Sequence, residues 1–116
     1  MEYADYDYDL AYEKTRKIIN NNPSVASFFI GGFEMAPATL KAVKDLGLSV
    51  PEDISIVCYN DNEILPLLDP PITSIKWPFY EMGKKAAELL LENSKDKKRV
   101  LFKTEMIIRG STSVKR

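Results

Sequence analysis

Three stretches of the chain repeat apolar residues at the three- and four-residue spacing of an amphipathic helix. Asp7 or Asp9 is placed to cap the first helix, which the turn residues 20–23 end. Gly47 ends the second helix, and Pro78 opens the third. The residues that share the three predicted faces are Ala11, Thr15, Ile18 and Ile19, then Met35, Thr39, Ala42, Val43 and Leu46, then Phe79, Met82, Ala86, Leu89 and Leu90.

Four other runs are apolar and rich in β-branched or aromatic residues, and they predict strands at 25–30, 54–59, 72–76 and 100–109. The order of elements is therefore α, β, α, β, β, α, β. A strand, a helix and a second strand in sequence form a βαβ unit, whose strands are parallel and covered by helices. The pattern predicts an α/β fold built on a parallel sheet.

The chain has 116 residues, which is enough for one compact domain or a piece cut from a larger protein. Sixteen Lys and Arg against seventeen Asp and Glu give a net charge of -1, so we do not expect this chain alone to bind a phosphate backbone. The basic stretch 95–99 is interpreted as a solvated connection. No apolar run approaches the ~20 residues of a membrane span and no signal peptide opens the chain, so a cytoplasmic protein is expected.

The residue types present exclude several kinds of chemistry. The chain has no histidine, which excludes the Ser-His-Asp and Cys-His arrangements and the HExxH metal helix. Its one cysteine, Cys58, lies in an apolar run, where a buried small side chain is expected and not a reactive thiol. Neither GxGxxG nor GxxxxGK[ST] occurs. We therefore predict no catalytic residue, no metal site and no cofactor.

Three segments follow predicted strands, at 31–34, 59–63 and 76–79. Ligands of open parallel sheets bind at the carboxyl ends of the strands, so these segments form the candidate site. Asn60 and Asp61 can hydrogen-bond a hydroxyl-rich ligand. They can equally serve the turn itself, because Asn and Asp side chains bond to their own backbone.

Aromatic residues stand in the same segments. Trp77 and Phe33 offer apolar faces for stacking on a sugar ring or base, although either ring can instead belong to the core. Gly31 and Gly32 predict a tight turn with exposed backbone amides. The opening stretch 2–9 alternates acidic residues with tyrosine or alanine, which fits an exposed lead-in or a segment that faces a partner.

Taken in order, these segments resemble the signatures of one family. The run LGLSVPEDISIVCYND at 46–61 resembles the "lGl.vPeDisvvGfDd" signature of LacI/GalR bacterial transcription regulators. PPITSI at 70–75 resembles their "PpLTTi" segment, GKKAAELLL at 83–91 fits "G..Aa.lLl", and IIRGST at 107–112 fits "lv.R.St". Together the matches cover most of the chain.

The resemblance implies an effector-sensing domain with the periplasmic-binding-protein fold, in which two lobes of a three-layer α/β sandwich close on a small ligand, often a sugar or nucleoside. The whole chain, 1–116, would be a C-terminal fragment of such a domain. Residues from about 10 to 76 would build part of the C-terminal lobe and a crossover. Residues 77–116 would be the closing helix and strand, and the DNA-binding headpiece would be absent.

Three positions depart from the family pattern. Members usually carry Asn-Asp where this chain has Gly32-Phe33, and the first Asp of "GfDd" is Asn60 here, although Asp61 is retained. Trp77 stands where many members have Gln. The resemblance thus implies ligand contacts at Gly32, Phe33, Asn60, Asp61 and Trp77, with a more apolar ligand or weakened sensing.

The stretch 64–68 holds four large aliphatic residues, more than a loop needs, and such patches usually mark contacts. In the family this region lies near a dimer interface, so the chain is expected to form a homodimer. Burial under the core helices is the alternative explanation. The expected interface residues are Ile64, Leu65, Leu67, Leu68, Met35 and Leu40.

These observations favour the sensing and dimerisation part of a LacI-like regulator, which performs no chemistry and takes a sugar-like effector in the intact protein. It would contact DNA only through a separate helix-turn-helix and would not contact a membrane. Two alternatives stay open. A flavodoxin-like receiver would use Asp61 as phosphate acceptor, but it needs further carboxylates for Mg²⁺ where the chain has Gly31 and Gly32. A ligand-free interaction fragment would self-associate through exposed apolar surface.

Overall fold

The computed structural model describes residues 1–92 and 96–114, and Lys95 of the predicted basic connection lies outside them. The predicted order of helices and strands is confirmed, with two short 3₁₀ turns added. The final strand is shorter than the predicted 100–109 because only residues 105–107 pair with a neighbouring strand. The elements are α1 (Tyr8–Asn21), β1 (Ser27–Ile30), η1 (Phe33–Met35), α2 (Ala36–Asp45), β2 (Ser55–Cys58), η2 (Leu65–Leu67), β3 (Thr73–Lys76), α3 (Phe79–Leu91) and β4 (Glu105–Ile107).

The helix ends follow the predicted signals. Asp7, and not Asp9, caps α1, and its carboxylate accepts a hydrogen bond of 2.8 Å from the backbone N–H of Leu10. Gly47 follows α2 with a φ of 75°, the left-handed conformation that glycine adopts without strain at a helix end. Pro78 directly precedes α3.

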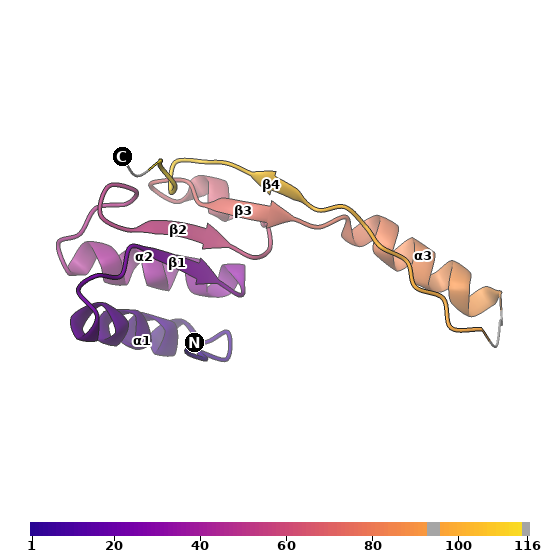
Figure 1. Cartoon of the computed structure of the whole chain (residues 1–116), viewed down its shortest axis with the longest axis horizontal. Coiled ribbons are helices and arrows are strands. Elements are labelled where there is room, and N and C mark those ends of the chain that lie inside the picture. Colours follow the sequence, from indigo (N-terminus) through magenta and orange to yellow (C-terminus); the bar gives the residue numbers. More distant parts are fainter. Residues whose placement is uncertain (93–95, 115–116) are drawn as a thin grey trace.

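The strands form one sheet in the order β1-β2-β3-β4. The first three are parallel, as predicted, and β4 is antiparallel to β3 because the chain returns to the sheet from the opposite direction (Figure 1). The α/β fold is confirmed. Helices α1 and α2 pack on each other on one side of the sheet, so the described residues supply two of the three layers of the expected sandwich.

The core lies between α2 and the helix-covered face of the sheet. Ile56 and Cys58 of β2 are fully buried there, as predicted for Cys58, and Ile54 and Ile72 join them from the strand entrances. On the opposite face of the sheet Phe29 is largely exposed. Alternate residues of β1 and β2 therefore face a packed core on one side and an uncovered surface on the other.

The last part of the chain leaves this packed body. The body, which we call the lobe, comprises residues 1–76 and 105–114, and residues 77–104, which we call the arm, project from it in Figure 1. The arm makes the molecule long, at 56 × 26 × 24 Å, and no residue of α3 is buried. Among the described residues, no helix is both long and apolar enough to cross a membrane.

Candidate functional site

The three segments that follow β1, β2 and β3 meet at one edge of the lobe, as their position after parallel strands predicts. The side-chain oxygen of Asn60 accepts a 3.0 Å hydrogen bond from the backbone N–H of Phe33. The indole N–H of Trp77 donates to the backbone carbonyl of Tyr59 at 2.8 Å. Hydrogen bonds thus join the segment after β2 to the segments on both of its sides.

Asn60 has one end of its amide engaged and the other available. Because the Phe33 N–H is a donor, the amide oxygen must face it, and the thiol of Cys58 also lies 3.7 Å from that oxygen. The amide nitrogen has no hydrogen-bond partner among the described residues. Asn60 therefore holds the edge together and keeps two N–H donors for an acceptor group on a ligand.

Asp61 is held from within the lobe. Its Oδ1 accepts a 2.6 Å hydrogen bond from the Ser74 hydroxyl and lies 2.9 Å from Nη1 of Arg109. Partial burial raises the pKa of the Asp61 carboxyl, but the hydrogen bonds from Arg109 and Ser74 and the charge of Arg109 outweigh it, and the pKa is lowered. Asp61 is thus ionised and already engaged at neutral pH.

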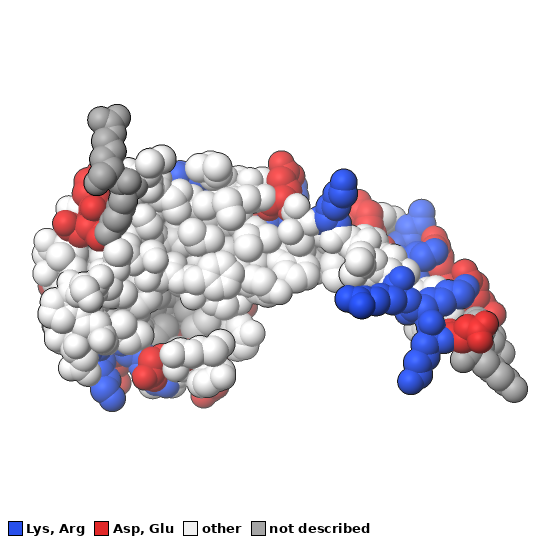
Figure 2. All heavy atoms as spheres, in the orientation of Figure 1, with Lys and Arg blue, Asp and Glu red and all other residues white. Residues whose placement is uncertain are grey.

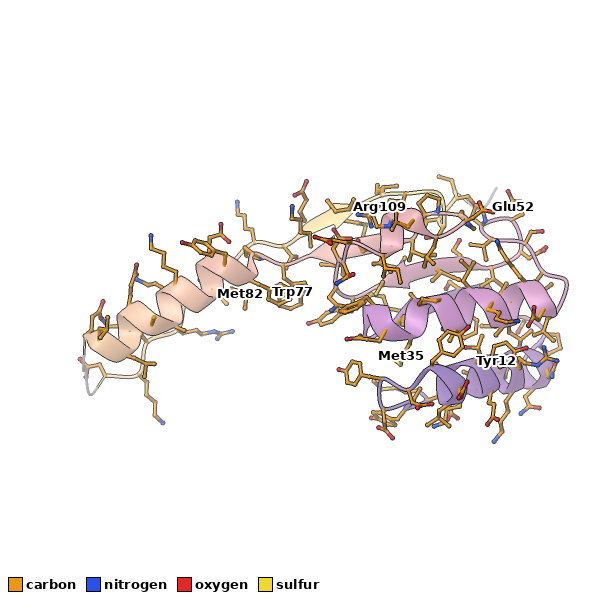
Figure 3. The ribbon with its side chains drawn as sticks, turned by 180° about the vertical axis from the view of Figure 1, so that it is seen from behind. Tyr12, Met35, Glu52, Trp77, Met82 and Arg109 are labelled. Carbon is orange, nitrogen blue, oxygen red and sulfur yellow. The ribbon has the colours of Figure 1, made fainter. Side chains whose placement is uncertain are left out.

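Aromatic rings run in a row from the uncovered face of the sheet to the arm. The centroids of Phe29 and Tyr59 are 5.9 Å apart, those of Tyr59 and Trp77 are 4.9 Å apart, and both pairs are edge-on. Trp77 stacks on Phe79 with centroids 6.2 Å apart and planes 13° apart. Trp77 is half-buried at the point where lobe and arm meet (Figure 3).

Phe33 and Gly32 are both held within the lobe. The Phe33 ring packs against the core, the alternative to a stacking role. Gly32 is buried under a side chain from the opening segment, since a Cβ placed on it would lie 2.6 Å from Cε1 of Tyr6 and 2.8 Å from a carboxylate oxygen of Glu34. Only a glycine allows this approach.

Tyr6 is therefore a member of the edge that the residue pattern missed. The alternation of acidic residues and tyrosine in 2–9 suggested a partner-facing segment, but nothing local tied that segment to Gly32. Tyr6 itself has a φ of 59°, which is uncommon for a bulky residue. Its ring remains largely exposed, so it lies over Gly32 and faces solvent.

A hollow of about 620 Å³ opens beside this edge. The opening segment 1–6 forms one wall and β1 the other, with Tyr6, Phe29 and Tyr59 among the lining residues. Its size is in the range of small-molecule sites, and its lining is mostly apolar. The edge therefore combines an amide donor with an aromatic-lined hollow.

Two further observations bear on chemistry. Burial raises the pKa of the Cys58 thiol, which keeps it protonated and poorly nucleophilic. No group of three or more Cys, Asp or Glu side chains in the described ranges is arranged to hold a metal ion.

The six expected interface residues divide into three pairs that differ in exposure. Leu40 and Leu65 are buried in the core, where η2 turns Leu65 inward, and they leave almost no surface for a partner to contact. Leu68 and Met35 are partly buried and pack against the same core. Ile64 and Leu67, at 39% and 81% exposure, are available on the surface.

Comparison with known proteins gives a consistent result. The family described as periplasmic binding protein-like domain matches residues 1–112. The HTH-type transcriptional repressor PurR of Aliivibrio fischeri is 37% identical over 116 residues, which cover 95% of this chain and 34% of PurR. The chain therefore spans about a third of that relative's length.

Solved structures agree with the sequence match. A transcriptional regulator CelR-cellobiose complex superposes with a TM-score of 0.84 at 29% identity, over 96% of this chain and 37% of the other. The lac repressor dimer bound to operator and the anti-inducer ONPF gives the same TM-score at 26% identity, over 94% of this chain and 39% of the other. All three relatives are named as transcriptional regulators and not as enzymes.

Proposed function

The chain belongs to the periplasmic-binding-protein-like domain family of LacI/GalR-type transcriptional regulators, and from this premise we propose that it is the effector-sensing and dimerisation part of such a regulator. Residues from about 10 to 76 form C-terminal-lobe elements and a crossover, and the arm belongs to the second lobe. The receiver alternative is withdrawn, because the family match covers nearly the whole chain.

The observation that carries the proposal is the edge where three segments converge. The free amide nitrogen of Asn60 donates to a hydroxyl or ring oxygen of the effector, while Tyr6, Tyr59 and Trp77 supply aromatic faces. An aromatic face with a few polar groups is the usual arrangement of a sugar site. The CelR complex with cellobiose supports a sugar-like effector for this chain.

The effector test belongs in an intact regulator that contains this chain, because the facing lobe completes the cleft. A panel of mono- and disaccharides, cellobiose included, and of nucleosides is screened by isothermal titration calorimetry. For the saccharide or nucleoside that binds, Asn60→Ala should weaken affinity by about 1 to 3 kcal/mol, because a polar partner is left unpaired.

Lys41→Met is the matched control for this test, because Lys41 lies on α2 away from the edge and its ion pair with Asp45 is exposed. It should leave affinity unchanged. Equal affinities for wild type and Asn60→Ala would remove Asn60 from the site. Absence of binding across the whole panel would count against a sugar or nucleoside effector and favour a ligand-free interaction module.

The same proposal includes a homodimer that uses Ile64 and Leu67. Both side chains are exposed on η2 and its cap, whereas the neighbouring Leu65 anchors this turn in the core. An exposed aliphatic pair on a fixed turn fits a two-fold contact, in which the same patch meets its own copy. The lac repressor structure, a dimer, supports this assignment.

Leu67→Glu should lower the mass measured by light scattering towards that of a monomer, because it places a charge in the interface. Leu90→Glu is the matched control, since Leu90 is equally exposed but lies on the arm. A wild-type monomer at high concentration would contradict the dimer. In the intact cytoplasmic regulator, effector binding changes the arrangement of the lobes and so the spacing of two helix-turn-helix headpieces.

A further inference from the structure

The segment Tyr59–Asn60–Asp61 is held at both of its ends. On one side the carbonyl of Tyr59 accepts the 2.8 Å hydrogen bond from the Trp77 indole. On the other side the Asp61 carboxylate takes bonds from Ser74 and Arg109. Asn60, the residue that offers a donor at the edge, therefore lies between two fixed points.

These two fixed points belong to the two connections between lobe and arm. Trp77 is the first residue after β3, on the chain that leaves for α3. Arg109 follows β4, on the chain that returns from the arm. Figure 3 shows Trp77 where the arm begins and Arg109 on the lobe.

Arg109 is well placed to act as a structural link. One nitrogen, Nη1, donates to the carbonyl of Ile72 at 2.7 Å and to the Ser74 hydroxyl at 2.9 Å, and it pairs with Asp61 at 2.9 Å. The side chains of Arg109 and Asp61 are only 15% and 21% exposed. A charge pair shielded to this degree is costly to break, because each partner would be left poorly solvated.

Trp77 makes the matching link on the outgoing chain. Its ring contacts Tyr59 edge-on and stacks on Phe79, the first residue of α3. A change in the direction of the arm would have to move the indole, and with it the hydrogen bond to Tyr59. The hydrogen bond between Trp77 and Tyr59 would therefore break if the arm changed direction.

We infer that Asp61 and Arg109 are positioning residues, which together with the Trp77–Tyr59 hydrogen bond couple the edge residue Asn60 to both connections between lobe and arm. Asp61 then acts on the ligand edge through Arg109 and does not itself contact the ligand. The inference depends on the proposed function only for the identity of the ligand at Asn60. The contacts that link Asn60 to the two connections are present without a ligand. Coupling of this kind is reciprocal.

The test uses the ¹⁵N-labelled 116-residue chain without any ligand. Trp77 is its one tryptophan, so its indole N–H gives a single resonance. Asp61→Asn keeps the shape of the side chain and removes its charge. We expect the indole resonance to shift and its exchange with solvent to accelerate on the order of tenfold, because the carbonyl of Tyr59 is no longer held in place. Asp61→Glu, which restores the charge, should recover part of the protection.

Lys41→Met is again the control, because it removes an exposed ion pair on α2 and should leave the indole unchanged. In the reverse direction, Trp77→Phe should accelerate exchange of the backbone amide of Phe33, which donates to the side-chain oxygen of Asn60. If Asp61→Asn does not fold, Ser74→Ala is the deciding variant, because it removes one hydrogen-bond donor to Asp61 and leaves the ion pair with Arg109. A smaller shift of the indole resonance in the same direction then supports the coupling.

The inference would be overturned if the indole resonance kept its position and exchange rate in folded Asp61→Asn, or in Ser74→Ala where that variant decides. The Asp61–Arg109 pair would then stabilise only its immediate surroundings. These outcomes are separate from the effector test, because no effector is added. Failure of every sugar to bind would leave the indole measurement standing, and an unchanged indole would leave effector binding by Asn60 standing.

Discussion

The lobe contains two amphipathic helices that pack on each other, whereas the helix of the arm has no packing partner among the described residues. In α2, Ala36, Ala38, Ala42 and Val43 are completely buried against the sheet and α1. In α3 the most exposed apolar residues reach 82% and 86% exposure, and none is buried. Apolar periodicity therefore fixes where a helix forms, but not what its apolar face meets.

The lobe and the arm also differ in their surface charges. In Figure 2 much of the visible face of the lobe is uncharged, whereas acidic and basic side chains gather on the arm. On the arm Lys85 pairs with Glu88, and Lys98 with Glu92. Exposed pairs of this type contribute little to stability, so the helix of the arm depends on its own propensity wherever no other polypeptide covers it.

The largest effect is expected from a cavity in the lobe. Ile56 lies at the centre of β2 and is fully buried in the core cluster. Ile56→Ala should reduce the free energy of unfolding by about 2 to 5 kcal/mol, since it removes buried methyl groups and leaves a void. Urea denaturation followed by circular dichroism measures the change.

Leu90→Ala on the arm is the matched comparison, and it should change the free energy of unfolding by no more than about 0.5 kcal/mol. Ile56→Val, which removes one methylene, should cost about 0.5 to 1.5 kcal/mol and keeps the series measurable if the alanine variant unfolds. Equal losses for Ile56→Ala and Leu90→Ala would mean that α3 packs in solution, and the contrast between lobe and arm would be wrong.

A smaller effect is expected where the lobe holds the returning chain. The pKa of Asp61 is lowered in the folded state, so its ion pair stabilises the fold above the unfolded pKa of about 3.9, and this stability is lost as the pH falls through the folded pKa. Near neutral pH, the free energy of unfolding of wild type should be larger than that of Asp61→Asn by about 1 to 3 kcal/mol. The gap should close progressively below about pH 4.

Denaturation of both proteins at a series of pH values measures this gap. A difference that stays constant from neutral to strongly acidic pH would show that the charge of Asp61 does not stabilise the lobe. In that case Arg109 would hold the returning chain through its side-chain bonds to Ile72 and Ser74 and its backbone bond to Thr73, without a contribution from the charge of Asp61.

Most of the fold could be predicted from local signals. Asp7, Gly47 and Pro78 mark helix boundaries through side-chain capping, positive φ and a missing N–H, all of which depend on a few neighbouring residues. The length of the last strand could not be predicted, since pairing with β3 decides it. The orientation of Leu65 depends likewise on how η2 turns into the core.

The location of the candidate site could be predicted from the sequence, but its long-range contacts could not. Parallel strands bring Asn60 and Trp77 to one edge, and periodicity alone establishes that. The approach of Tyr6 to Gly32, and the pairing of Asp61 with Arg109 48 residues later, are long-range contacts without any local pattern. Reasoning from motifs therefore assigned Asp61 to the ligand, although its carboxylate is already engaged within the lobe.

The smallest effect is expected in the arm, at Gly83. This residue lies inside α3, and a Cβ added to it would meet nothing within 4 Å, so no contact opposes a larger side chain. Gly83→Ala should stabilise α3 by about 1 kcal/mol, because glycine loses more backbone freedom than alanine when a helix forms. Hydrogen exchange of the α3 amides should slow about fivefold, with little change in the lobe. Gly47→Ala is the comparison in the lobe, where the left-handed φ makes the same substitution destabilising. If exchange in α3 is unchanged by Gly83→Ala, the helix propensity of its own sequence is not what sustains this helix, and tertiary or intermolecular packing stabilises it instead.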